Sequence, residues 1–236
     1  MNILALESSA IACSAALCRD GTLIAQSFQC SGLTHSRTLL PMVNDMLKNC
    51  GQSLDQMDAI AVAAGPGSFT GLRIGVAAAK GLAWAGEKPC APCSTLRSMA
   101  WPLAHLEGKI IVCAMDARRQ QVYNALFLAR GEELERLSPD RAVSLEELGA
   151  ELKNFPETKI VVGDGAQLCY NTLKEAVPGL TLAPAHLRMQ SAWGVAIEGE
   201  KLAYAGGLVS GADLVPVYHR LSQAERERLE REKGRE

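Results

Sequence analysis

Residues 65–75 of the chain read Gly-Pro-Gly-Ser-Phe-Thr-Gly-Leu-Arg-Ile-Gly. This stretch follows an apolar run at 59–64 and precedes a run with helical spacing that begins near Gly71, so it predicts a strand, a glycine-rich turn and the start of a helix. Free backbone N–H groups and the positive end of a helix dipole would meet at such a turn. The turn is therefore a candidate anion site.

Two familiar phosphate-binding loops do not fit this turn. A P-loop ends in Gly-Lys-Ser or Gly-Lys-Thr, whereas Lys80 comes well inside the predicted helix. The dinucleotide fingerprint needs a glycine where this chain has Thr70. The turn is consequently of another kind.

The rest of the chain alternates predicted strands and helices. Strands are expected at 2–7, 13–18, 22–29, 59–64, 89–93, 110–115, 121–128 and 159–163, and helices at about 36–49, 71–85, 145–154 and after Gly165. Each half begins with a strand, an acidic turn (Glu7-Ser8-Ser9 or Asp116-Ala117-Arg118) and a returning strand. This repetition predicts an α/β fold with two related units.

Composition limits the class of protein. The chain has 236 residues, of which 48% are hydrophobic and 21% charged, and this balance is typical of a soluble globular protein. No apolar run approaches the roughly 20 residues that span a membrane, and no basic segment precedes an apolar start as in a secretory signal. We therefore expect a cytoplasmic protein without a membrane association. A net charge of −2 argues against a chain that holds nucleic acid by itself.

Eight cysteines are present, most of them in apolar runs, which favours buried free thiols. Cys90 and Cys93 form a C-x-x-C pair that can mark a redox dithiol or half of a zinc site. No second such pair completes a zinc set, and the pair opens a predicted strand rather than a long helix. The role of Cys90 and Cys93 is left open.

The glycine stretch closely resembles the GPGSxTGxRxG signature of the TsaB (YeaZ) family, which is required to install threonylcarbamoyl on tRNA adenosine next to the anticodon. The resemblance covers about residues 1–220, and Glu7 stands where the family more often has Asp. Further similar segments are 3–9 (ILALESS), 12–17 (ACSAAL), 34–37 (THSR), 40–43 (LPMV), 94–96 (STL), 115–118 (MDAR), 122–123 (VY) and 216–220 (PVYHR).

The resemblance implies the actin, sugar-kinase and heat-shock-ATPase superfamily fold, with two related α/β domains of which the second is reduced. We expect an N-terminal domain at 1–104, a C-terminal domain at 105–220 and a charged, flexible tail at 221–236. In that superfamily, nucleotide phosphates lie between two acidic hairpins. The short second half of the chain and the presence of Glu7 in the first hairpin favour a degenerate nucleotide cleft. Alternatively, the acid of each hairpin only caps its own turn.

The resemblance also implies a subunit that is not itself the catalyst. The catalytic relative TsaD begins the corresponding helix with Asn-His-x-x-x-His, whose histidines bind iron or zinc, whereas this chain has Thr95 and Met99 at those two positions. The implied role is to pair with TsaD and the small ATPase TsaE in transferring threonylcarbamoyl from its adenylate to tRNA. Alternatives are a small-molecule kinase or ATPase of the same superfamily, and a metallopeptidase.

The expected partner surface consists of the helices at about 36–49 and 71–85, and it would serve TsaD and, when the chain is alone, a homodimer. Small residues in the second helix would allow another helix to approach closely. Transfer RNA would be contacted only through the complex. No cofactor is expected in the isolated chain. An adenine nucleotide could bind at the interface with the partner. The candidate interface residues are His35, Gly67, Ser68, Thr70, Arg73, Ala78 and Ala79.

Two of these candidates carry alternatives. Arg73 would either hold a carboxylate or phosphate with its planar guanidinium, or brace the glycine turn. Ser68 lies outside a Gly-x-Ser-x-Gly elbow, so nothing in the sequence supports it as a nucleophile.

Overall fold

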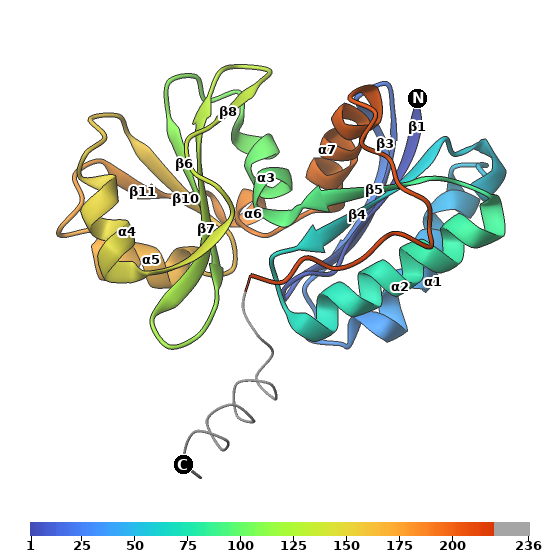
Figure 1. Ribbon diagram of the computed structural model, residues 1–236, viewed down its shortest axis with the longest axis horizontal. Coiled ribbons are helices and arrows are strands. Elements are labelled where there is room, and N and C mark those ends of the chain that lie inside the picture. The colour runs from blue at the N-terminus through green and yellow to red at the C-terminus, as the bar shows by residue number, and fades with distance from the viewer. Residues whose placement is uncertain (220–236) are drawn as a thin grey trace, which may run out of the picture.

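The computed structural model describes residues 1–219, and the tail expected at 221–236 lies outside them. Two β-sheets form two lobes that lie side by side, and helices cover both faces of each sheet (Figure 1). No helix in the described part of the chain is both long and apolar enough to cross a bilayer.

The first sheet has five strands in the order β3-β2-β1-β4-β5. Its strands are β1 (Asn2–Glu7), β2 (Cys13–Arg19), β3 (Thr22–Gln29), β4 (Ala59–Gly65) and β5 (Cys90–Ser94). Strands β1 to β3 form an antiparallel meander, and β4 and β5 run parallel to β1. The continuous apolar sequence of β4 fits a central parallel strand that is buried on both faces.

The second sheet repeats this topology in the order β11-β10-β6-β7-β8, with β9 also paired to β7. Its strands are β6 (Ile110–Asp116), β7 (Gln121–Ala129), β8 (Leu134–Arg136), β9 (Arg141–Ser144), β10 (Lys159–Val162) and β11 (Leu180–Leu182). As in the first sheet, a hairpin comes first and two parallel strands follow on its other side. The two related units expected from the sequence are therefore present, and the second has shorter strands.

Two helices cover the outer face of each sheet. These are α1 (His35–Asn49) and α2 (Phe69–Gly86) on the first sheet, and α4 (Leu145–Leu152) and α5 (Ala166–Leu173) on the second. Helix α1 buries Leu39, Val43, Met46 and Leu47, a spacing that places one apolar stripe against the sheet. Short helical segments lie at Leu54–Gln56, Trp101–Leu103 and Ala185–Arg188 (α6).

The inner faces are covered by an exchange of helices between the lobes. Helix α3 (Thr95–Ala100) follows β5 of the first sheet but packs in the core of the second, with Leu96 and Met99 against Phe127. Helix α7 (Ala192–Tyr204) follows the second lobe but packs on the first sheet. The expected division at 104/105 differs from this arrangement, because it assigns α7 to the lobe that α7 does not cover.

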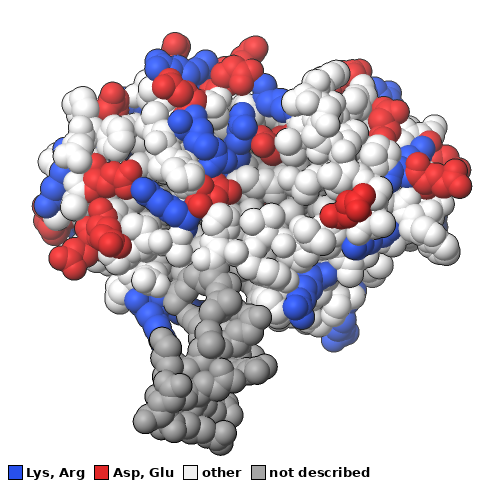
Figure 2. Space-filling model, in the orientation of Figure 1, with Lys and Arg blue, Asp and Glu red and all other residues white. Residues whose placement is uncertain are grey.

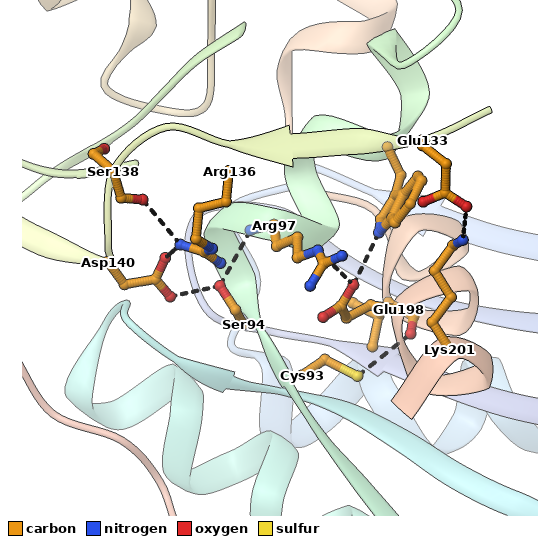
Figure 3. Close-up of polar contacts among 11 residues, drawn as sticks. Cys93, Ser94, Arg97, Glu133, Arg136, Ser138, Asp140, Glu198 and Lys201 are labelled. Carbon is orange, nitrogen blue, oxygen red and sulfur yellow. Dashed lines mark hydrogen bonds and ion pairs between the residues drawn. The ribbon is translucent and has the colours of Figure 1, made fainter. Parts of the chain in front are cut away.

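Polar contacts join the two exchanged helices to each other and to the second lobe (Figure 3). The indole Nε1 of Trp101 donates to Glu198 Oε2 at 3.1 Å. The Arg97 guanidinium lies 3.3 Å from the same oxygen, at ion-pair distance but without hydrogen-bond alignment. Two further contacts reach the second lobe. The Ser94 hydroxyl donates to the Asp140 carboxylate at 2.5 Å, and the Lys201 ammonium donates to the Glu133 carboxylate at 2.6 Å.

Replacing Glu198, which is buried, tests how much this contact stabilises the fold. Glu198→Ala leaves the Trp101 N–H without its acceptor, so we expect the free energy of unfolding to fall by about 1–3 kcal/mol. Lys201→Ala is the matched control, because it removes a half-exposed ion pair and should cost about 1 kcal/mol or less. Urea titration measures both, and equal losses would contradict the role given to Glu198.

Candidate functional site

The glycine turn lies against the end of β1. The Ser68 backbone N–H donates to the Ser9 carbonyl at 2.6 Å, and the Ser8 hydroxyl donates to the Gly71 carbonyl at 2.9 Å. Ser68 is also the N-cap of α2, where its hydroxyl oxygen accepts from the Gly71 N–H at 3.3 Å. Some backbone N–H groups at the start of α2 thus already have hydrogen-bond acceptors within the chain.

The glycines are required by these close approaches. A Cβ atom at Gly67 would lie 2.6 Å from the Ser9 carbonyl oxygen, and one at Gly71 would overlap the Ser8 carbonyl. Gly65 has a positive φ of 142°, and a Cβ atom there would overlap the Val217 carbonyl. Gly65 thus combines a positive φ angle with a close backbone approach, and Gly67 and Gly71 allow close backbone approach alone.

The segment that follows α7, residues 205–219, runs along α2 and ends at the glycine turn (Figure 1); we call it the strap. Its Val217 N–H donates to the Ala64 carbonyl at 2.7 Å, and Leu214 is buried in the core of the first lobe. The Lys80 ammonium donates to the Ala212 and Leu214 carbonyls at 3.1 and 3.0 Å. The strap therefore holds α2 from the side opposite α1.

Arg73 joins the strap to the start of α2. Its guanidinium carbon lies 3.8 Å from the centre of the Phe69 ring, and its Nε donates to the Tyr218 hydroxyl at 3.1 Å. The Phe69 and Tyr218 rings are 4.9 Å apart. Of the two roles considered for Arg73, these contacts support bracing.

Carboxylates from both lobes approach one another at the ends of β1, β6 and β10. Glu7 ends β1 and is 1% exposed; its Oε1 accepts from the Ser9 N–H at 2.6 Å, and its Oε2 has no partner among the described residues. Asp164 follows β10 and accepts from the Gln190 amide at 3.0 Å. Asp116 ends β6 and accepts from the Arg118 N–H at 2.7 Å. We call Glu7, Asp116 and Asp164 the acidic cluster.

Burial and mutual repulsion favour the protonated forms of Glu7 and Asp164. The pKa of Glu7 is raised to about 7, mainly by burial and to a smaller extent by the charge of Asp164, against the opposing effect of the hydrogen bonds with Ser9. Burial likewise raises the pKa of Asp164, with a smaller contribution from Asp116. The negative charge that remains on this cluster opposes phosphate binding unless a cation or a second protein offsets it.

Thr95 and Met99, which stand where TsaD carries its histidines, are buried in the second lobe's inner core. Within residues 1–219, no three His, Cys, Asp or Glu side chains gather as a metal site would require. His35 begins α1, and its Nε2 lies 2.7 Å from the Ala10 carbonyl. His35 and the glycine turn thus both contact the segment that follows β1.

The prediction that Ala78 and Ala79 face outward is wrong for Ala79. Ala79 has no exposed surface and belongs to the stripe of α2 that packs on the sheet, while Ala78 is half-buried against the same core. The outward stripe contains Ala77, Gly81 and Trp84 instead, and Trp84 is 86% exposed. Ser68, Thr70 and Arg73 are exposed at the start of the same helix.

The groove between α1 and α2 could not be predicted from the sequence. The groove has a volume of about 600 Å³, and its apolar lining includes Leu40, Leu47 and Leu82. Leu40 is about half exposed at its rim. The residues missed at the glycine turn are Val217 and Tyr218, although the similar segment at 216–220 could have indicated them.

Comparisons with known proteins agree with one another. Residues 30–177 match the family described as TsaD, tRNA N6-adenosine threonylcarbamoyltransferase. The Bacillus subtilis protein named tRNA threonylcarbamoyladenosine biosynthesis protein TsaB is 34% identical over 99% of this chain and 100% of its own length. The Escherichia coli protein of the same name is 34% identical, and the match covers 93% of this chain and 95% of the Escherichia coli protein.

Solved structures confirm the fold class. A Pseudomonas aeruginosa protein described as similar to the peptidase YeaZ has a TM-score of 0.79 and 28% identity, covering 93% of this chain and 99% of its own. YeaZ from the same organism has a TM-score of 0.76 and 28% identity, and the match covers 92% of this chain and 99% of the YeaZ chain. The expected actin-like α/β fold with two related lobes is thus confirmed.

Two glycines of the same helix separate the effect of close approach from that of helix propensity. Gly71→Ala should lower the free energy of unfolding by more than about 1 kcal/mol, because its Cβ would overlap the Ser8 carbonyl, which cannot rotate away. At Gly81 the added Cβ would meet open space, so Gly81→Ala should raise the free energy of unfolding by up to about 1 kcal/mol. Thermal and urea unfolding measure both. Similar effects of the two changes would contradict the packing argument.

The pKa of Glu7 predicts a pH dependence of stability. Because the pKa is about 7 in the folded protein against an ordinary 4.5, the folded state binds this proton more tightly than the unfolded state does. The contribution of Glu7 is fully present below about pH 4.5 and is lost as the pH rises through 7, a loss of roughly 3 kcal/mol. Glu7→Gln stays neutral and should not show this decline in urea titrations from pH 5 to 8.5. Parallel pH profiles of the two proteins would show that Glu7 does not titrate in this range.

Proposed function

The chain belongs to the TsaB (YeaZ) family, and from this membership we propose that it is the non-catalytic partner of TsaD in forming N6-threonylcarbamoyladenosine on tRNA. The observation that carries the proposal is 34% identity over nearly the whole length of a TsaB protein. In this role, the chain acts with TsaD and TsaE while threonylcarbamoyl is transferred from its adenylate to the adenosine beside the anticodon.

The contacts of the candidate residues support a binding role. The Ser68 hydroxyl caps α2, the Arg73 guanidinium is stacked on Phe69, and Thr95 and Met99 lie in a core. None of these arrangements presents an activated nucleophile or a pair of imidazoles to solvent. The kinase or ATPase alternative has less support, because the relatives at 34% identity are named tRNA threonylcarbamoyladenosine biosynthesis proteins.

The surface of α1 and α2 is suited to a helical partner. Ala77 and Gly81 present little bulk, so another helix can approach the α2 backbone, and Trp84 and Leu40 supply apolar area beside them. The groove between the two helices receives side chains from the partner. We assign this surface to TsaD and, in its absence, to a second copy of the chain, so that the two assemblies compete.

An adenine nucleotide would fit only where a partner completes its site. The start of α2 offers the exposed hydroxyls of Ser68 and Thr70, but the Ser68 and Gly71 N–H groups already have acceptors within the chain. We therefore propose that the isolated chain has no bound cofactor and that any nucleotide binds at the interface with TsaD.

Charge supports contact with tRNA through the complex rather than directly. The chain has a net charge of −2. Figure 2 shows Lys and Arg interspersed with Asp and Glu on the visible face, which has no extended field of one sign. Phosphate binding by a single chain needs clustered cations.

A reconstituted modification reaction with TsaD, TsaE, tRNA and threonylcarbamoyl-adenylate tests the role. Omitting the chain should abolish modification, and Ala77→Trp, which places a bulky ring on the outward stripe, should weaken TsaD binding in calorimetry and reduce modification in parallel. Ser68→Ala should leave modification largely intact, at a stability cost of about 1 kcal/mol for the lost cap.

Three results would contradict the proposal. One is loss of modification by Ser68→Ala while the complex still forms, which would indicate chemistry at Ser68. Another is substrate-stimulated ATP hydrolysis by the isolated chain, which would favour the kinase alternative. The last is inactivation of the chain by chelator treatment before mixing, which would favour the metallopeptidase.

A further inference from the structure

Strand β3 is a long and unprotected sheet edge. Its eight residues, TLIAQSFQ, include no charged residue and no proline, and in the described part of the chain it pairs only with β2. Ile24 and Phe28 are 44% and 47% exposed. Proteins commonly protect such edges with charges, prolines or very short strands, since an open edge pairs readily with another chain.

The other strands that end the two sheets within residues 1–219 are protected. Strands β8 and β11 have three residues each, and β8 carries Glu135 and Arg136. Strand β5 is bridged to the strap through Cys90 and Val209. The open edge at β3 is therefore an exception within the molecule. A bulge at Ile24 lies near its first end and leaves residues 25–29 regular.

We propose that β3 is a self-association surface, at which two copies of the chain pair their β3 strands antiparallel to form one continuous ten-stranded sheet. Strand β3 borders α1, with which it lines a groove, but the pairing uses the strand edge and not the outward stripe of α2.

The sequence of β3 selects a register. Directly opposed residues of an antiparallel pair lie on the same face of the sheet. When a strand pairs with its own copy, the twofold axis must therefore pass between two copies of the same residue, and not between peptide bonds. Placing Gln26 on the twofold axis puts Ile24 of each copy opposite Phe28 of the other. Phe28 lies on the α7 side, since it pairs with Ser14, whose hydroxyl accepts from the Ala192 N–H at 2.7 Å.

Several features favour a second copy as the occupant. The Ile24–Phe28 pairs cover half-exposed apolar area in both copies, and the two Gln26 amides can bond to each other. The strand has no charge that would repel an identical strand. A register with Ser27 on the axis would instead pair Phe28 with Gln26.

Engineered cysteines test both the pairing and its register. The full chain would carry Cys30→Ser, which removes the exposed native thiol, and Ala77→Trp, which blocks association through α2. Gln26→Cys should then form a disulfide-linked dimer under mild oxidation, because directly opposed residues meet the distance requirement of a disulfide. Ser27→Cys is the matched control and should remain monomeric.

Charges placed on the edge should abolish association without oxidation. Ile24→Lys and Phe28→Lys should each remove the concentration-dependent increase in mass seen by analytical ultracentrifugation, while Val215→Lys, on an exposed residue of the strap, should not. Circular dichroism confirms that each variant is folded. Amide exchange should also slow in β3 as protein concentration rises.

The proposal is overturned if neither cysteine variant forms a dimer, if both form it equally, or if the lysine variants associate as the parent does. It is equally overturned if β3 amides are protected only when TsaD is added, since a strand of that partner would then be the occupant.

Discussion

Each sheet of this protein has an inner face that is covered by a helix from the other half of the chain. Helix α3 leaves the first sheet to pack on the second, and α7 returns from the second lobe to pack on the first. Both sheets are buried on two sides only because this exchange occurs. The lobes are consequently joined through packed side chains as well as through the contacts of Glu198, and the ends of β1, β6 and β10 are held facing one another.

The exchange determines what surrounds the glycine turn. The chain continues from α7 into the strap, which reaches the turn from one side while Ser8 and Ser9 reach it from the other. Space that a ligand could otherwise occupy next to these glycines is thus taken by the chain's own backbone. What stays accessible is the outward stripe of α2 and the groove beside α1, a surface whose chemistry suits helix packing. The proposed role as a partner subunit follows from this distribution of filled and open surface.

Much of the fold could be predicted because strands and amphipathic helices leave periodic patterns, and the repeated hairpin indicated two related units. The position of α7 could not, since an apolar helix satisfies either sheet equally well. The burial of Ala79 was missed because α2 has small residues on nearly every side, so its composition does not reveal which stripe is buried. The strap has no periodicity, and its contacts with Ala64 and Arg73 depend on tertiary structure alone.

The exchanged helices also bear on how the protein is made. Translation proceeds from the N-terminus, and domains commonly fold as they emerge from the ribosome. Here the first sheet is complete at Ser94, but the helix that covers its inner face ends at Tyr204. The inner surfaces of β1 and β4 therefore stay uncovered while roughly a hundred further residues are synthesised. A nascent chain in that state exposes an apolar sheet face together with the β3 edge, which makes this interval the period of greatest demand for a ribosome-bound chaperone.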